Sequence, residues 1–111
     1  NILLDERGGP NHVQNFCFAP IHANTKTSEL TYTPTYFYIG HFSKFINPGA
    51  KRVSTTTSRT SLESTSFLNS DGSLVTVVMN KTDAKINYKL AVGSLESVIE
   101  ILPHAMQTIV Y

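Results

Sequence analysis

The sequence has no tryptophan, one cysteine and few charges, which make up 15% of its 111 residues. A single cysteine, Cys17, cannot form an internal disulfide bond, and its apolar neighbours favour a buried, inert thiol over a nucleophile. The lack of tryptophan removes the largest planar side chain that a carbohydrate-binding surface can stack on sugar rings. One thiol does not show in which cellular compartment the protein resides. We expect the parent protein to be bacterial and either secreted or periplasmic.

The charge balance is close to neutral, with nine basic and eight acidic side chains and a net charge of +1. The nearest approach to a basic cluster is Lys51-Arg52, so we expect no nucleic-acid partner. Apolar runs stay far below the ~20 residues that span a bilayer. The sequence starts without Met inside the apolar run Ile2-Leu3-Leu4, and we therefore expect it to be a segment of a longer protein.

Two zones of different character open the chain. Residues 1–33 predict a loop-rich arm with two short strands, because turn residues and polar stretches interrupt every apolar run. Residues 34–46 predict a helix, with Thr33 as its cap, Pro34 at its first position and Asn47-Pro48-Gly49 as its stop. Its aromatic face implies docking on an apolar surface larger than the rest of this chain supplies. That face consists of Tyr38, Phe42 and Phe45.

Residues 47–111 predict a β-sandwich domain. Asp71-Gly72 is a hairpin signal, and the apolar run that follows it is typical of a strand buried on both faces. Strands at about ten-residue spacing favour an antiparallel, immunoglobulin-like sandwich, a mainly β fold. The expected strands are 64–69, 74–80, 86–92, 95–102 and 106–111, and the Ser/Thr-rich residues 54–61 are expected at a strand edge with a polar loop.

The side chains that carry chemistry do not form a catalytic or metal-binding pattern. Glycoside hydrolysis needs two facing carboxyl groups about 5 Å or 6.5–9.5 Å apart. Asp5 and Glu6 are adjacent and point to opposite sides of an extended chain, while Glu96 and Glu100 lie about 13 Å apart along a strand. The four histidines lack metal-ligand spacing, so we expect no metal and no cofactor.

Three segments carry more specific motifs. The first runs Gly8-Gly9-Pro10-Asn11-His12-Val13 and continues with Asn15-Phe16 and Ala19-Pro20-Ile21. The second, residues 36–46, reads YFYIGHFSKFI and is followed by Pro48-Gly49, and the third joins residues 69–73 to residues 77–80. In register, they resemble the G-G-P-N-[WH]-V-x-N-F, F-Y-x-x-G-H-F-S-K-F-I and P-D-G-S…V-V-V-x-N motifs of family 30 glycoside hydrolases of the glucosylceramidase type.

This resemblance implies an architecture. The arm would follow the eighth strand of a (β/α)8 barrel, residues 34–46 would be its outer helix, and residues 47–111 the attached sandwich. The two glutamates that perform retaining hydrolysis in the family would precede Asn1, so the chain carries no catalytic residue of its own. Asp5 matches a position where the family often has a sugar-binding Asn, with loop capping as the alternative role. His12 and Phe18 depart from relatives near the barrel mouth.

The function implied is the C-terminal part of a retaining β-glucosidase that cleaves glucosylceramide, another glycosphingolipid or a related β-glucoside. On this hypothesis the sandwich is structural support, its partner is the missing N-terminal catalytic barrel, and residues 1–111 alone are inactive. A carbohydrate- or lipid-surface-binding module is the alternative, as is the same family acting on β-1,6-glucan or xylan. We also expect the isolated chain to self-associate through Tyr38, Phe42 and Phe45, or to leave this helix poorly ordered.

Overall fold

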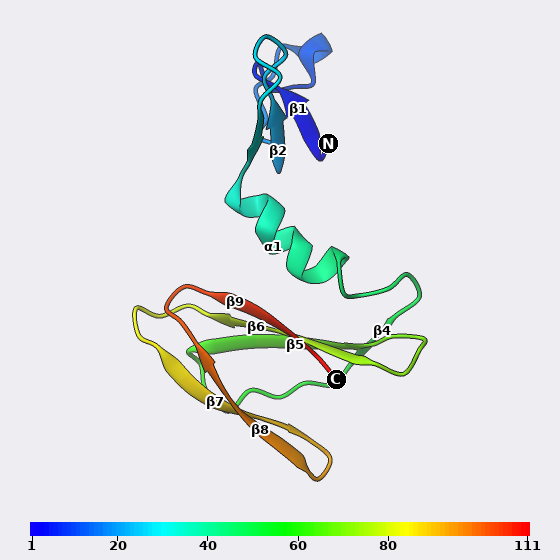
Figure 1. Cartoon of the computed structure of the whole chain (residues 1–111), viewed down its shortest axis with the longest axis vertical. Helices are drawn as coiled ribbons and strands as arrows, with labels where there is room; N and C mark the ends of the chain where they lie inside the picture. Colours follow the sequence, from blue (N-terminus) through cyan, green and yellow to red (C-terminus); the bar gives the residue numbers. More distant parts are fainter. The chain divides into compact units, whose positions relative to one another are not determined.

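The structure is a computed structural model that describes the backbone of all 111 residues and every side chain except that of Asn11. The chain divides into two compact units, Asn1–Gly40 and His41–Tyr111 (Figure 1). No helix in the described part of the chain is long and apolar enough to cross a membrane.

The first unit is an arm built on very short strands. β1 (Leu3–Asp5) pairs in parallel with β2 (Ile21–Ala23), which pairs antiparallel with β3 (Leu30–Tyr32), and η1 (Asn11–Val13) lies in the loop between β1 and β2. A turn joins β2 to β3, where the Asn24 side chain accepts hydrogen bonds from the amides of Lys26 and Thr27. The arm thus has three strands where the sequence predicted two, because three-residue strands leave little apolar periodicity to detect.

The helix α1 (Pro34–Ser43) begins at the predicted residue and ends three residues before the predicted Ile46. Thr33 precedes it and accepts a hydrogen bond from the Tyr36 amide through its carbonyl. Residues 44–46 form a looser turn, in which the amides of Phe45 and Ile46 both reach the Phe42 carbonyl. Every side chain of α1 is at least partly exposed, including Tyr38 and Phe42, and Phe45 beyond it is half-buried.

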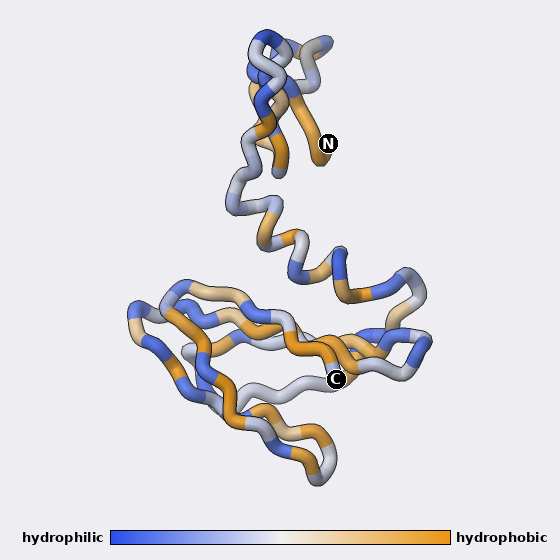
Figure 2. The backbone as a smooth tube through the Cα atoms, viewed as in Figure 1, coloured by the Kyte–Doolittle hydropathy of each residue, from blue (hydrophilic) through white to orange (hydrophobic). Residues whose placement is uncertain are grey.

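The second unit is an antiparallel β-sandwich, which confirms the predicted fold class (Figure 1). One sheet has the strand order β4-β5-β6-β9 and the other consists of β7 and β8. The strands are β4 (Lys51–Val53), β5 (Leu62–Leu68), β6 (Leu74–Asn80), β7 (Ile86–Val92), β8 (Leu95–Ile101) and β9 (Met106–Val110). Along β7 more buried and more exposed residues alternate, and apolar and polar residues alternate in its first half (Figure 2), as a sheet with one covered face requires.

The core of the sandwich lies between these two sheets. Leu62 and Val78 from the larger sheet contact Ile86 and Ile101 from the smaller one, and Tyr88, Ala105 and Ile109 pack around them. β6 is buried on both faces, as its apolar sequence predicted: Val75, Thr76, Val77 and Val78 are each at most 3% exposed. At the end of β6, the side chain of Asn80 donates to the carbonyls of Ala84 and Leu102 and accepts two hydrogen bonds from Thr82.

The turn between β5 and β6 comprises residues 69–73 and contains Asp71-Gly72, which the sequence identified as a hairpin signal. Asn69 closes it through a backbone hydrogen bond with Ser73 (2.9 Å), and the Asp71 carboxylate accepts from the Ser73 amide and hydroxyl. Gly72 has φ +90°, a left-handed conformation that side chains with a Cβ atom disfavour.

Gly72→Ala should therefore lower the free energy of unfolding of the sandwich by about 1–2 kcal/mol. Apart from Gly72 and its two chain neighbours, no described atom lies within 4 Å of the Cβ position, so the loss comes from local backbone strain and not from a clash with the rest of the fold. Chemical denaturation of Gly72→Ala and Gly72→Asn measures this effect. Asn tolerates left-handed backbone, so equal losses for the two variants would contradict the explanation.

Candidate functional site

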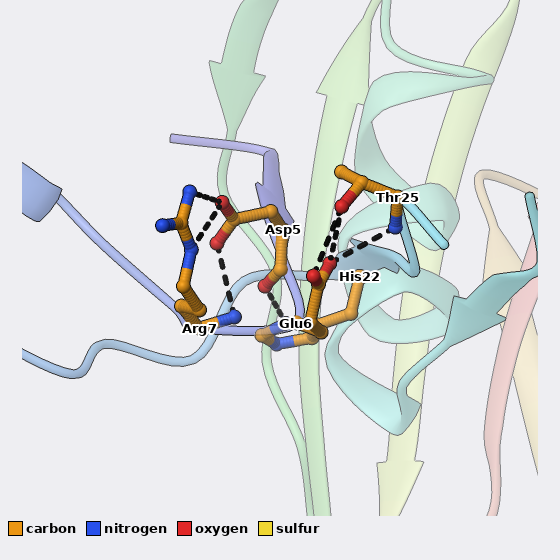
Figure 3. A network of polar contacts seen from close by, with 5 residues as sticks. All are labelled: Asp5, Glu6, Arg7, His22 and Thr25. Carbon is orange, nitrogen blue, oxygen red and sulfur yellow. Dashed lines mark hydrogen bonds and ion pairs between the residues drawn. The ribbon is translucent and has the colours of Figure 1, made fainter. Parts of the chain in front are cut away.

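The candidate substrate-binding residue, Asp5, ends strand β1 and faces Arg7 (Figure 3). One carboxylate oxygen accepts the Arg7 amide (3.0 Å), and the other accepts the guanidinium Nε (3.3 Å) and Nη2 (3.0 Å). The Asp5 side chain is 20% exposed and that of Arg7 74% exposed. A sugar hydroxyl that donates to Asp5 would therefore share this carboxylate with Arg7.

Glu6 lies in the turn that follows β1, and its side chain points away from the Asp5 carboxylate and contacts Thr25 (Figure 3). Its carboxylate accepts the Thr25 amide (2.9 Å) and the Thr25 hydroxyl (2.9 Å). The hydrogen bond from the Thr25 amide is the main cause that lowers the pKa of the Glu6 carboxyl below its ordinary value, and the hydroxyl adds to it. Asp5 and Glu6 thus form two separate clamps and not a catalytic pair.

His22 closes the loop between β1 and β2. The Ala19 amide donates to His22 Nε2 (3.0 Å), so the ring proton belongs on Nδ1, which lies 3.3 Å from the Asp5 carbonyl and donates to it. These two contacts give His22 a structural role in the loop. His22 ties residue 19 to residue 5 and so brings the two ends of the loop together.

The loop presents aromatic side chains to solvent. Phe16 is 57% exposed and Phe18 82% exposed. Their rings pack edge to face, with 5.1 Å between the ring centroids. His12, the other position that departs from relatives, is also exposed. Cys17 is half-buried, where the sequence predicted a buried thiol, and its sulfur accepts a hydrogen bond from the Asn15 side chain (3.3 Å).

Four of the other six carboxylates contact bases on the sandwich surface. Lys81 pairs with Glu63, Lys85 with Glu100 and Lys89 with Glu96, and His104 contacts Asp83. Among the described side chains, no group of three His, Cys, Asp or Glu residues could hold a metal ion. The chemistry available in these residues is hydrogen bonding and apolar contact.

A second polar cluster, missed from the sequence, joins the end of α1 to the sandwich within the second unit. The Thr108 hydroxyl donates to the His41 carbonyl (3.1 Å) and accepts from His41 Nδ1 (2.9 Å). Asn69 donates to the Phe45 carbonyl (3.0 Å) and accepts the Asn47 amide (2.9 Å). These bonds explain why the helix ends early, since Asn69 takes up the backbone groups that follow Ser43. Both partners are 22 or more residues away, so local sequence patterns do not reveal them.

A pocket of about 720 Å³ opens between the two sheets of the sandwich. Its floor carries a chain of hydroxyl groups, from Ser66 to Thr76 (2.8 Å) and from Thr76 to Tyr111 (2.9 Å). Leu90 and Val92 of β7 and the polar residues 54–59 complete the walls. The hydroxyls satisfy one another, which is the arrangement expected of a structural polar network.

Comparison with known families finds two adjoining matches. Residues 1–46 match the glycosyl hydrolase family 30 TIM-barrel domain, and residues 49–109 match the glycosyl hydrolase family 30 beta sandwich domain. The chain is 37% identical to the lysosomal acid glucosylceramidase of Mus musculus over 102 residues, which cover 88% of the chain and 20% of the mouse protein.

Solved structures agree with these matches. The structure of SrfJ from Salmonella typhimurium superposes on the whole chain with a TM-score of 0.94 and 32% identity. The endo-beta1,6-glucanase BT3312 superposes on 97% of the chain with a TM-score of 0.84 and 22% identity, a likeness of fold alone. The chain spans between a fifth and a quarter of the length of these relatives.

The Glu6–Thr25 clamp should weaken in acid. The lowered pKa of Glu6 means that the clamp contributes fully above the ordinary carboxyl pKa of 4.5 and is lost as the pH falls through the lower, folded-state value. An NMR titration of the Glu6 carboxyl carbon and the Thr25 amide measures this. Thr25→Val removes the hydroxyl but keeps the hydrogen bond from the residue 25 backbone amide to Glu6. The pKa of Glu6 should therefore rise only part of the way to its ordinary value. An ordinary Glu6 pKa in the unmodified chain would contradict the clamp.

The joint between α1 and the sandwich should depend on the Thr108 hydroxyl. Thr108→Val keeps the shape of the side chain and leaves the His41 carbonyl and Nδ1 without their partner, which should cost about 1–2 kcal/mol of unfolding free energy. Thr108→Ser retains the hydroxyl and is the matched control. Chemical denaturation compares the two variants, and equal stabilities would show that the hydroxyl does not hold the joint.

Proposed function

The chain belongs to glycosyl hydrolase family 30, and on this basis we propose that residues 1–111 are the C-terminal portion of a retaining β-glucosidase of the glucosylceramidase type. The proposed substrate is glucosylceramide or a related β-glucoside. The observation that carries this proposal is the 37% identity to a protein named glucosylceramidase across 88% of the chain. The chain's own chemistry is consistent with a supporting part of such an enzyme.

Residues 1–111 lack the means to perform the reaction alone. Retaining hydrolysis needs a nucleophile and an acid/base about 5–5.5 Å apart. Of the eight carboxylates, Asp5 and Glu6 hold Arg7 and Thr25 in separate clamps. Most of the others pair with basic side chains or with turn residues of the sandwich. We therefore propose that both catalytic glutamates lie in the barrel, in the part of the protein that precedes Asn1.

The parts of this chain then have distinct tasks. Residues 1–33 form the arm after the last barrel strand, residues 34–46 the outer barrel helix and its final turn, and residues 47–111 the supporting sandwich. The His41–Thr108 and Asn69 bonds fix the end of that helix to the sandwich. Asp5, at the carboxyl end of β1, is proposed to accept a hydrogen bond from a sugar hydroxyl, because barrel active sites form at the carboxyl ends of the strands.

A comparison of purified residues 1–111 with the full-length protein that contains them tests whether hydrolysis requires the barrel. The full-length protein should hydrolyse an aryl β-glucoside and glucosylceramide with retention of anomeric configuration, and residues 1–111 should hydrolyse neither. Activity of residues 1–111 alone, or a full-length protein that cleaves only β-1,6-glucan or xylan, would overturn the proposal. Saturable binding of glucosylceramide vesicles by residues 1–111 would favour a binding module instead.

The role of Asp5 is tested in the same full-length protein. Loss of a hydrogen bond to a charged group costs about 1.5–3 kcal/mol, so Asp5→Ala should lower kcat/KM at least tenfold. Arg7→Ala is the matched control, because it removes the internal partner and leaves the carboxylate in place. Equal losses in both variants would assign Asp5 to loop capping.

A further inference from the structure

We propose that Asp71-Gly72 is a modification site, at which isoaspartate forms spontaneously, and that the hydrogen bonds of the folded turn suppress this reaction. An aspartate followed by glycine rearranges most readily, because glycine has no side chain beside its amide nitrogen. Of the eight acidic residues, only Asp71 precedes a glycine. The reaction is internal to the chain and independent of the proposed glucosidase function.

The rearrangement joins two groups of the same turn. The backbone nitrogen of Gly72 loses its proton and bonds to the side-chain carboxyl carbon of Asp71, which releases one oxygen as water and closes a succinimide ring. Water then opens the ring. Attack at the side-chain carbonyl restores aspartate, and attack at the main-chain carbonyl leaves isoaspartate, in which the chain runs through the side-chain methylene. One water is released and one is consumed, so the mass does not change.

The Gly72 nitrogen is occupied in the fold. Its N–H donates to the Asn69 carbonyl (3.1 Å), and this hydrogen bond must open before the nitrogen can lose its proton. Asn69 is itself held in place, because its side chain donates to the Phe45 carbonyl (3.0 Å) and accepts the Asn47 amide (2.9 Å). The acceptor of the Gly72 hydrogen bond therefore cannot move away without breaking contacts to the residues that follow α1.

The Asp71 carboxyl is held in its unreactive form. One of its oxygens accepts from the Ser73 hydroxyl (2.7 Å) and the Ser73 amide (2.9 Å). These bonds, with the hydroxyl as the larger cause, lower the pKa of the Asp71 carboxyl below its ordinary value. A charged carboxylate reacts poorly with the Gly72 nitrogen, because the oxygen that must leave carries no proton. The Ser73 hydroxyl also accepts from the Asn69 side chain (3.1 Å), so Asn69, Ser73 and Asp71 form one network.

Isoaspartate at residue 71 would add one atom to the main chain inside this turn. The turn is closed by the hydrogen bond from the Asn69 amide to the Ser73 carbonyl (2.9 Å), directly beside the last pair of the β5–β6 ladder. A longer main chain disturbs that closure and the Asn69 side chain with it. Damage at residue 71 would therefore reach the joint between α1 and the sandwich.

The experiment measures isoaspartate at residue 71 of the full-length protein during incubation at neutral pH, in the native state and unfolded in guanidinium chloride. Mass spectrometry of a digest with electron-transfer fragmentation distinguishes isoaspartate from aspartate. Isoaspartate should accumulate at residue 71 in the unfolded protein. Its rate should be at least about tenfold lower in the native protein, because hydrogen bonds to a charged group must open first. Asp83, which precedes Ala84, is the internal control and should react more slowly than Asp71 when unfolded.

Ser73→Ala tests the network directly, because it removes the hydroxyl that donates to the Asp71 carboxylate and should raise the native rate about threefold or more. Ser70→Ala is the matched control and should leave the rate unchanged. Ser70 lies in the same turn, but the described hydrogen bonds to that carboxylate come from Ser73.

Equal rates at residue 71 in native and unfolded protein, or no isoaspartate in either, would overturn the proposal. Equal native rates in Ser73→Ala and Ser70→Ala would do the same. The comparison of native with unfolded protein needs no variant, so it decides the proposal even if Ser73→Ala fails to fold.

Discussion

The burial of β6 on both faces is the constraint on which the second unit depends. One face takes part in the core between the sheets through Val78, and the other carries Val75 and Val77 in register with Val110 and Thr108 of β9. Thr108 bonds to His41, so the covered outer face looks toward the end of α1. Asn69 lies in the turn before β6 and Asn80 is its last residue. Both side chains donate hydrogen bonds to carbonyls that are distant in the sequence.

The arm is stabilised in a different way. Its strands have three residues each, too few to bury a core, and Ala19 is its one fully buried apolar side chain among those described. Order comes instead from paired polar contacts, Asp5 with Arg7, Glu6 with Thr25 and His22 with both ends of its loop. Such contacts depend on pH and on salt when exposed. The arm is therefore held in shape by charge and hydrogen bonding, while the sandwich is held by apolar burial.

Sequence patterns predicted the sandwich well and the site poorly. The strands β6, β7 and β8 were placed within one residue because their apolar periodicity is strong, and the start of α1 follows from Thr33-Pro34. The end of α1 was misplaced because Asn69, far along the chain, binds the backbone there. Asp5 was identified through its motif, but its pairing with Arg7 and the His22 bridge depend on loop geometry that spacing does not encode.

Asn80 has a consequence for how the protein is made. Asn80-Lys81-Thr82 is a sequon for N-linked glycosylation, yet Asn80 is 1% exposed, and the amide nitrogen that would carry the sugar donates to two carbonyls. The Thr82 hydroxyl, which the sequon also requires, binds the same side chain. A glycan at Asn80 and the folded sandwich are therefore mutually exclusive. In a eukaryotic secretory host, any chain glycosylated here before folding would be kept out of the native state.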